Sequence, residues 1–309
     1  MKYNWNKELS TLPIDIHCPH IPSDIDNQTK ECVSKFLEDG YAIIKNAVPQ
    51  DIVKYLKTNI ATGYNNQAYC NYYCNGKKVF EKFSPKAKKY LNAELKILDA
   101  HYFDRKAQKA IFSRPIRNFL KTIFGGDTLP LAFQSLSFIK GSGQSIHDDR
   151  TFVRVNSVGN FVASWIALED VKEKSGELIY YPKSHKLKPH RFKDGSIWNF
   201  TKEEINIYSD TLVSKAKKAG LVTEKFYAKA GDVLFWHSGL LHGGTNNNNG
   251  LTRTSLVTHY CPYLNSYPPY LLNNPNAQSH IRKTIGDDTI TGAVSTAFKE
   301  YYNSKYTGL

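Results

Sequence analysis

The sequence predicts a mainly β protein with added helices, built on an antiparallel sandwich or jelly roll. Short apolar runs separated by turn residues follow one another from about residue 130 to 262, which is the spacing of such folds. Before residue 130, apolar residues recur instead at helical spacing. The chain also holds 20 Tyr and 16 Phe, residue types that favour strands.

The N-terminal part is expected to form a helical layer. Apolar side chains share one face of a helix over residues 27–38, and a short apolar strand follows at 41–44. Pro49 then opens a second amphipathic helix, because proline suits the first turn. The Asn-, Tyr- and Lys-rich segment 64–90 is expected to be a loop region, and 104–124 to give one or two further helices.

The β core is predicted over residues 130–262, interrupted by a polar, partly helical insert at roughly 186–222. The expected strands are 130–139, 145–154, 159–168, 177–181, 225–236 and 251–261. A tail follows from 263 to 309. We expect residues 1–309 to form one domain, with 1–129 as the N-terminal helical layer.

Composition narrows the classes of function and location. The 309 residues carry 41 Lys and Arg against 28 Asp and Glu, a net charge of +13. This charge is typical of a Lys-rich solvated surface, or of a protein that binds an anionic ligand. No basic segment interleaved with aromatics stands out, so we expect no nucleic-acid partner. An odd number of cysteines, five, and no long apolar run favour free thiols in a cytoplasmic protein without a membrane partner.

The segment 145–153, SIHDDRTFV, contains a candidate half of a metal site. Alternation along a strand places His147 and Asp149 on one face and Asp148 on the other. Two histidines and one carboxylate form the triad that suits non-haem Fe(II) and leaves positions open. By itself this tripeptide is common, and an edge-strand histidine beside a solvated aspartate is the alternative.

Two segments downstream could complete such a site. In 231–245, GDVLFWHSGLLHGGT, His242 stands beside glycines that allow close packing, while His237 is a competing candidate. In 251–261, LTRTSLVTHYC, alternation places Arg253 and Ser255 on one face. A guanidinium there could hold a carboxylate bidentately; the alternative is an arginine on a solvated strand face.

Taken together, four segments resemble the phytanoyl-CoA dioxygenase family of Fe(II)/2-oxoglutarate-dependent oxygenases, over about residues 33 to 262. They are FLEDGYAIIKNAVPQDIVKYL (36–56), SIHDD, ASWIALEDVKEKSGELIYYPKSHK (163–186), and GDVLFWHSGLLHGG followed by Arg253. Each segment is a weak signal alone, and their order makes the resemblance specific. It implies a double-stranded β-helix core of the cupin-like jelly-roll type, with the N-terminal helices packed on one sheet.

The resemblance also implies cofactors and roles. Fe(II), 2-oxoglutarate and O2 would be the cofactors. The residues assigned to the iron are His147, Asp149 and His242, and those assigned to 2-oxoglutarate are Arg253, Ser255, Gln134 and Trp165. Since Asp149 is present, halogenation is disfavoured, because halogenating relatives have a small residue there.

The implied reaction is hydroxylation of a small polar or anionic metabolite, derived from a sugar, a phosphate or an amino acid, with release of succinate and CO2. Desaturation, oxidative cyclisation and epimerisation use the same chemistry and are alternatives, as are a non-oxygenase cupin-type metalloenzyme and a binding module. Substrate selectivity is expected in the least regular segments. The candidate substrate contacts there are Tyr69, Tyr73, Lys77 and His190.

Overall fold

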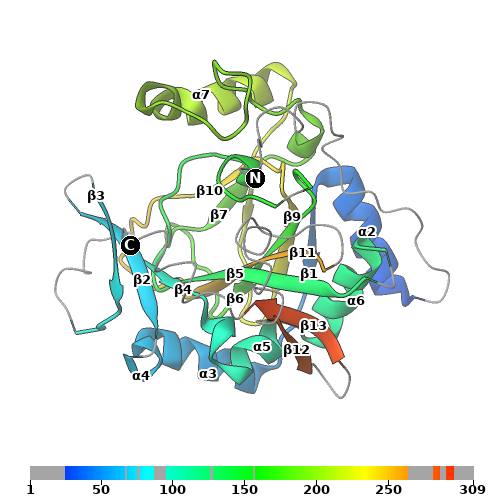
Figure 1. Cartoon of the computed structure of the whole chain (residues 1–309), viewed down its shortest axis with the longest axis vertical. Coiled ribbons are helices and arrows are strands. Elements are labelled where there is room, and N and C mark those ends of the chain that lie inside the picture. Colours follow the sequence, from blue (N-terminus) through cyan, green and yellow to red (C-terminus); the bar gives the residue numbers. More distant parts are fainter. Residues whose placement is uncertain are drawn as a thin grey trace, which may run out of the picture.

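The structure is a computed structural model. It describes residues 25–66, 68–74, 77–86, 95–125, 128–155, 157–263, 281–285 and 290–295. Two antiparallel sheets of unequal size stack on each other, and helices cover the outer face of the larger one (Figure 1). In these residues, no helix has both the length and the apolar character needed to cross a membrane.

The helices follow the apolar spacing of the sequence. They are α2 (Asn27–Asp39), α3 (Gln50–Ala61), α4 (Gly63–Asn66), α5 (Arg105–Ile111), α6 (Arg114–Ile123) and α7 (Lys202–Lys218). Asp26 caps α2, since its side chain accepts the Thr29 amide at 2.8 Å. The helix ends at Gly40, whose φ of +80° is left-handed, a conformation that glycine adopts without strain. The predicted helices at 27–38 and 104–124 are therefore confirmed, as is a helix in the insert.

The larger sheet contains most of the β structure. Its strand order is β1 (Tyr41–Ile44), β9 (Val233–His237), β6 (Val162–Ala167), β11 (Ser255–Pro262), β5 (Pro130–Phe138), β4 (Lys96–Leu98), β2 (Tyr69–Cys74) and β3 (Lys77–Lys82). A hairpin of β12 (Ile281–Ile285) and β13 (Ile290–Ser295) joins it, with β13 parallel to β5. Part of the predicted tail thus belongs to this sheet.

The smaller sheet has the order β10 (His242–Gly244), β7 (Leu178–Tyr180) and β8 (Glu224–Phe226). A layer of apolar side chains fills the space between the sheets. The Trp165 ring of the large sheet meets the Phe226 ring of the small one, with centroids 5.8 Å apart. This two-sheet packing is the predicted jelly-roll core.

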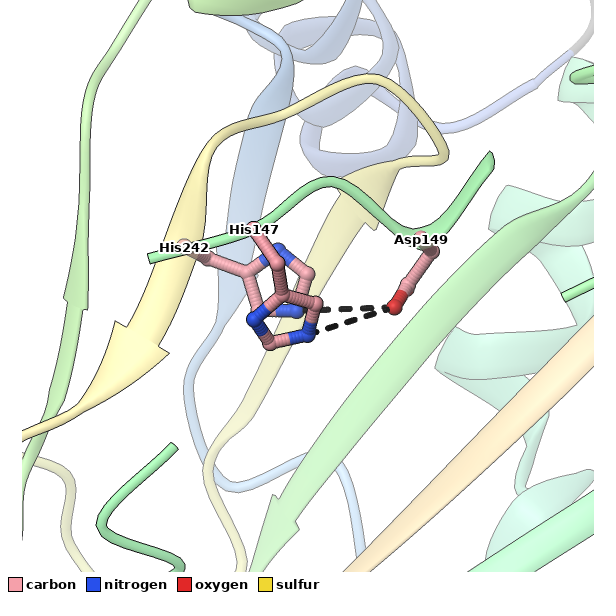
Figure 2. A group of neighbouring side chains, drawn as sticks. All are labelled: His147, Asp149 and His242. Carbon is pink, nitrogen blue, oxygen red and sulfur yellow. Dashed lines mark ion pairs between the residues drawn. The ribbon is translucent and has the colours of Figure 1, made fainter. Parts of the chain in front are cut away.

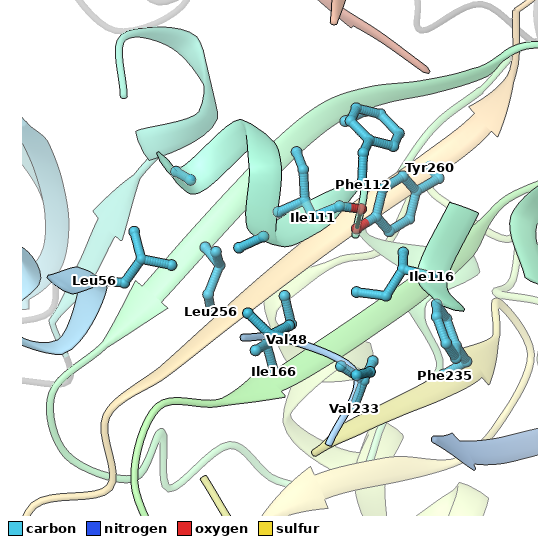
Figure 3. Packing of buried hydrophobic residues seen from close by; sticks show 14 of the residues in the cluster. Val48, Leu56, Ile111, Phe112, Ile116, Ile166, Val233, Phe235, Leu256 and Tyr260 are labelled. Atoms are coloured by element: carbon cyan, nitrogen blue, oxygen red, sulfur yellow. Dashed lines mark hydrogen bonds between the residues drawn. The ribbon is translucent and has the colours of Figure 1, made fainter. Parts of the chain in front are cut away.

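A second apolar layer lies between the large sheet and the helices (Figure 3). Phe119 of α6 stacks on Phe235 of β9 with ring centroids 4.1 Å apart. The Tyr260 hydroxyl, on β11, donates to the carbonyl oxygen of Ile111 at 2.9 Å, so this buried polar group is satisfied. The core between sheet and helices confirms that the N-terminal helices pack on one sheet.

Three expected elements differ from the structure. Residues 145–154 do not form a strand: His147 makes an isolated bridge, and the chain then winds into a short 3-10 helix at Asp149–Thr151. The expected strand 225–236 is divided between the two sheets, because the chain turns at Gly231, with φ +92°. Segment 64–90 was expected to be a loop region, but it includes the strands β2 and β3.

The strand β2 has a two-residue burial period that its polar composition obscures. The side chains of Cys70 and Tyr72 share one face and are buried, whereas the side chain of Tyr69 on the opposite face is exposed. Because alternate residues of a strand face opposite sides, this pattern shows that one face of β2 is buried and the other is exposed. The N-terminal layer therefore contributes strands as well as helices, and the organisation as a single domain stays a prediction.

Candidate functional site

The two histidines of the predicted triad lie opposite each other on two backbones that pair directly. The His147 amide donates to the His242 carbonyl oxygen, and the His242 amide to that of His147, both at 2.9 Å. Close approach depends on Gly243, where a Cβ would lie 2.6 Å from the Gln144 carbonyl oxygen. This pairing, rather than a strand over 145–154, brings the rings together, with centroids 4.4 Å apart.

Each imidazole is oriented by its own backbone. Nδ1 of His147 lies 2.8 Å from the Ser145 carbonyl oxygen, and Nδ1 of His242 lies 2.9 Å from that of Leu240. A carbonyl oxygen only accepts hydrogen bonds, so Nδ1 carries the proton in both rings and Nε2 presents its lone pair. Burial, with the nearby His242, lowers the pKa of His147 to about 3, which keeps this ring neutral and able to bind a metal.

Asp149 provides the third donor (Figure 2). Its Oδ1 lies 3.7 Å from Nε2 of His147 and 3.7 Å from Nε2 of His242. The three donor atoms lie within 4.8 Å of one another and all three residues are buried. The Asp149 amide donates to the Ser238 carbonyl oxygen at 3.0 Å, which fixes the start of the 3-10 helix. Two imidazoles that present Nε2 and one carboxylate are the donor set that fits Fe(II).

The outer oxygen of Asp149 also has neighbours. Nε1 of Trp236 donates to Oδ2 at 2.7 Å, and Nε2 of His259 lies 3.4 Å from the same oxygen. Burial alone would raise the pKa of the Asp149 carboxyl, but the rings of His242, His259 and His147 outweigh it and hold this pKa below its ordinary range. The carboxylate is therefore ionised at neutral pH. Nothing in the sequence singles out Trp236 or His259 as a partner of this carboxylate.

Asp148 lies outside this group of donors. It is 2% exposed, and its Oδ2 lies 3.1 Å from Nη2 of Arg150, itself buried. The double aspartate is thus divided between two tasks, because Asp149 faces the histidines and Asp148 neutralises a buried guanidinium. The chain turn at Asp149 separates the two side chains, not the strand alternation that the sequence suggested.

His237, the competing histidine, is also outside the group. It lies at the end of β9, and its ring packs near those of Phe36 and His185, with centroids 6.1 and 5.2 Å away. Its Nδ1 accepts the Gly239 amide at 2.9 Å. His237 is therefore a buried core histidine on the helix side of the large sheet.

A cavity of about 400 Å³ opens beside the triad. Its walls include all three triad residues together with three of the residues predicted to contact the cosubstrate, namely Gln134, Trp165 and Arg253. Ser255, the fourth, is fully buried and does not line the cavity. Apolar walls are provided by Leu136, Phe138, Leu178 and Val257.

Arg253 is an unmatched buried cation. It is 2% exposed, and no salt bridge joins it to any residue that the structure describes. The carboxylate of Glu177, whose charge acts on it, pairs instead with Nζ of Lys225 at 3.0 Å. Burial lowers the pKa of Arg253 to about 10, so the guanidinium is still charged at neutral pH. A buried charge is costly without a paired counter-ion, and the one carboxylate whose charge acts on Arg253 is engaged by Lys225.

The cavity also has walls that the sequence did not indicate. Lys96 and Phe152 both line it, and Phe152 is 49% exposed although its ring lies 5.6 Å from that of His147. Two of the predicted substrate contacts, Tyr69 and His190, do not line it. His190 packs instead on Phe192, with ring centroids 4.9 Å apart. The other two are Tyr73 in β2 and Lys77 in β3, whose side chains lie outside what the structure describes.

Two curated relatives share part of the sequence. The phytanoyl-CoA dioxygenase domain-containing protein 1 homolog of Caenorhabditis elegans is 32% identical over 90 residues, which are 28% of this chain and 31% of the relative. The peroxisomal phytanoyl-CoA dioxygenase of Rattus norvegicus is 29% identical over 133 residues, 40% of this chain and 36% of the relative. The matched segments thus span about a third of the length of these relatives.

Solved structures establish the fold. The carbocyclase SnoK from nogalamycin biosynthesis superposes with a TM-score of 0.55 at 16% identity, over 90% of this chain and 99% of its own. EctD from S. alaskensis, solved with 2-oxoglutarate and 5-hydroxyectoine, gives 0.56 at 17%, over 80% and 82%. The epimerase SnoN, solved with Fe3+, alpha ketoglutarate and nogalamycin RO, gives 0.56 at 17%, over 78% and 86%.

The family is established by a profile that covers most of the chain. The sequence profile described as phytanoyl-CoA dioxygenase (PhyH) matches residues 36–255. This range includes all three residues of the triad and Arg253. The chain belongs to the phytanoyl-CoA dioxygenase family.

Proposed function

We propose that the protein is an Fe(II)- and 2-oxoglutarate-dependent dioxygenase that hydroxylates a small polar or anionic metabolite and releases succinate and CO2. One observation carries the proposal: the buried His147–Asp149–His242 group and the unmatched cation Arg253 open into the same cavity. The first fits a divalent iron with open positions, and the second fits a carboxylate. A dicarboxylate cosubstrate needs both.

In this proposal each residue has a definite task. His147, Asp149 and His242 would hold Fe(II), which with 2-oxoglutarate and O2 supplies the oxidising power for attack on a C–H bond. Arg253 would hold the far carboxylate of 2-oxoglutarate. Gln134 adds a polar group to the same wall, and the Trp165 ring supports the guanidinium, whose Cζ lies 5.2 Å from the ring centroid.

Ser255 is the weakest member of this set. Its hydroxyl has no hydrogen-bond partner among the residues that the structure describes, although it is fully buried two positions after Arg253. A buried hydroxyl is expected to find a partner. Because Ser255 does not line the cavity, its contact with the far carboxylate of the cosubstrate rests on the family resemblance and stays a prediction. The apolar walls at Leu136, Phe138 and Val257 would exclude water from the bound cosubstrate.

The substrate end of the cavity favours an anionic molecule with an apolar part. Lys96 adds a second cation to the wall of the cavity, and the chain as a whole carries +13. Phe152 offers an exposed aromatic face next to the triad, and Phe200 of the insert continues it with ring centroids 6.0 Å apart. These groups replace Tyr69 and His190 as the substrate contacts that we propose.

The triad does not distinguish hydroxylation from other outcomes of the same chemistry. The solved structures of similar fold are named as an epimerase, a carbocyclase and a protein bound to a hydroxylated ectoine. Hydroxylation is proposed because it needs only the cofactors and a positioned C–H bond. Arg253 argues against a non-oxygenase metalloenzyme, since such an enzyme has no need of a site for a dicarboxylate.

We also propose the reducing cytoplasm as the compartment and one domain as the organisation. Two of the cysteines that the structure describes, Cys32 and Cys261, are buried free thiols. Buried free thiols suit a reducing environment.

The test is anaerobic addition of Fe(II) and 2-oxoglutarate to the purified protein. We expect the weak visible charge-transfer band of the chelate in the natural protein and its loss in Asp149→Ala. With air, succinate should form only when all three cofactors are present. Turnover that needs neither O2 nor 2-oxoglutarate would support a different metalloenzyme, and failure to bind iron at all would support a binding module.

A further inference from the structure

The outer oxygen of the Asp149 carboxylate has two partners of its own. We propose that Trp236 and His259 form a cradle that holds this oxygen, so that Asp149 offers a metal Oδ1 alone. The inference rests on the proposed function, because it assigns a positioning role toward the iron. It adds two residues that contact neither the metal nor 2-oxoglutarate in that proposal.

Trp236 is the firmer half of the cradle. Its indole N–H donates to Oδ2 at 2.7 Å, the length of a strong hydrogen bond to an ionised acceptor. The side chain is 3% exposed and lies on β9, which is paired on both sides, with β1 and with β6. Its ring centroid is also 4.7 Å from that of His242. One rigid side chain therefore contacts two of the three members of the triad.

His259 is the other half. It lies on β11 between β5 and β6, with its Nε2 3.4 Å from Oδ2. Its ring is held between those of Phe133 and Phe161, with centroids 6.1 and 6.0 Å away. Neither ring nitrogen has a hydrogen-bond partner among the described residues, although both are buried. The Asp149 carboxylate lies within ion-pair distance of Nε2, without the alignment of a hydrogen bond.

The geometry of Asp149 gives the cradle its consequence. Oδ1 is equidistant from the two histidine Nε2 atoms, whereas Oδ2 points toward Trp236 and His259. A carboxylate bound through one oxygen leaves a face of an octahedral ion open for cosubstrate and O2. If Oδ2 were released, both oxygens could chelate the metal and occupy one of those positions. The cradle therefore protects the open face as well as orienting the ligand.

The chain contains a matched control for this role. Trp198 is also buried, at 7% exposure, and its indole N–H donates at 2.6 Å to the carbonyl oxygen of Arg150. That acceptor is a backbone group, not the carboxylate. Trp236→Phe and Trp198→Phe thus each remove one buried indole N–H while keeping an aromatic ring, and only the first removes it from Asp149.

The test measures metal affinity without turnover. Ni(II), which binds such sites more tightly than Fe(II), is titrated calorimetrically into the metal-free protein. We expect Trp236→Phe to weaken binding roughly 10-fold or more, and Trp198→Phe to stay within about 2-fold of the natural protein. The Co(II) absorption spectrum, which depends on coordination number, should change in Trp236→Phe only. Equal affinities in the two variants would overturn the proposal.

A double-mutant cycle separates positioning from a general effect on the fold. In the Asp149→Ala background, Trp236→Phe is expected to cost no further affinity, because the acceptor is gone. The same loss in both backgrounds would show that Trp236 acts through the fold, and would refute the cradle. If Trp236→Phe does not fold, His259→Phe tests the other half in the same cycle, since its apolar surroundings accept a phenyl ring.

Failure of the cradle and failure of the proposed function give different results. If the natural protein binds no divalent metal, the proposed function fails. If it binds metal and the Trp236→Phe and His259→Phe variants bind it equally well, only the cradle fails.

Discussion

The backbones of His147 and His242 hydrogen-bond to each other in both directions, with both N···O distances at 2.9 Å. Two segments far apart in the sequence are thereby fixed at one point. Backbone pairing sets the separation of the two residues, and the Nδ1 contacts with Ser145 and Leu240 orient the rings, so protein contacts alone hold both imidazoles in place. This preorganisation favours metal binding because little conformational entropy is left to lose.

Gly243 is predicted to be essential for this pairing. A Cβ at this position would lie 2.6 Å from the Gln144 carbonyl oxygen and 3.2 Å from the carbonyl carbon of Ser145, so Gly243→Ala must push the His147 segment away. We expect metal affinity to fall by at least roughly 10-fold, the scale of losses when ligand orientation is disturbed. Calorimetric titration with Ni(II) measures it.

Gly244→Ala is the matched control. Its Cβ would meet the Ser142 hydroxyl at 2.5 Å, the end of a side chain that can rotate away. Metal affinity is expected to change much less than in Gly243→Ala. Similar losses in the two variants would mean that the backbone pairing is not what sets the ligand geometry.

Substitution of the two adjacent aspartates is predicted to change two different properties, metal binding for Asp149 and stability for Asp148. Asp149→Ala should lose Fe(II) binding and keep only the weak Ni(II) affinity of the two histidines. Asp148→Ala should leave a buried Arg150 without its partner and lower the free energy of unfolding by about 3–5 kcal/mol, while the folded protein still binds metal. Urea unfolding measures the second effect, and anaerobic titration at low temperature measures the first. Loss of metal by folded Asp148→Ala would contradict the division of tasks.

Arg253 is predicted to favour cosubstrate binding at a cost in the stability of the protein without cosubstrate. Arg253→Gln should weaken 2-oxoglutarate binding by about 2–3 kcal/mol, roughly 30- to 150-fold, because hydrogen bonds between charged groups are lost. Without cosubstrate the variant should be at least as stable as the natural protein, since an unmatched buried cation is removed. Metal affinity in the absence of 2-oxoglutarate should not change. A variant that loses metal as well would place Arg253 among the groups that support the triad.

The stability of the protein is predicted to depend on pH through two buried groups beside β5, Asp99 and His101. Burial raises the pKa of Asp99 from 3.8 to about 8, which the Ser135 amide, donating to Oδ1 at 2.6 Å, only partly offsets. Between these values the unfolded chain binds fewer protons, so stability falls as pH rises through this window. Burial also lowers the pKa of His101 from 6.5 to about 3. Between these values the unfolded chain binds more protons at this residue, so the contribution of His101 to stability rises with pH.

The two effects oppose each other below pH 6.5, and only that of Asp99 acts above it. The free energy of unfolding should therefore fall by about 2 kcal/mol between pH 6.5 and 8, at about 1.4 kcal/mol per pH unit. Asp99→Asn has no carboxyl to ionise and should show no such fall. Urea unfolding of both proteins at the two pH values checks this, and parallel curves would show that Asp99 is already ionised in the folded state.

Part of this fold could be predicted from the sequence because its signals are local. Helical spacing located α2, α3, α5 and α6, and apolar runs located β5, β6 and β11. Segment 145–154 has the composition of a strand but lies where the chain crosses between sheets, and the position of the partner backbone decided its conformation. The strands β2 and β3 were missed because neither YCNYYC nor KKVFEK shows a regular alternation of apolar and polar residues.

The candidate site was predicted from the order of its residues along the chain. His147, Asp149, His242 and Arg253 were accessible because their order along the chain resembles a known family. Trp236, Lys96 and Phe152 were not, because each acquires its position only when β9, β4 and the 3-10 turn come together in space. Asp149 was chosen over Asp148 by an argument from strand alternation that the structure replaces with a turn.

The short turn after Asp149 is tied to the insert at two points. The carbonyl oxygen of Arg150 accepts the Trp198 indole N–H at 2.6 Å, and the Thr151 hydroxyl lies 2.8 Å from that of Tyr208 on α7. The segment that carries the metal ligand Asp149 therefore also anchors the insert at 186–222. An exchange of the insert that aims at a new compound would have to supply both attachments again, because they hold the inserted segment on the turn at Arg150 and Thr151.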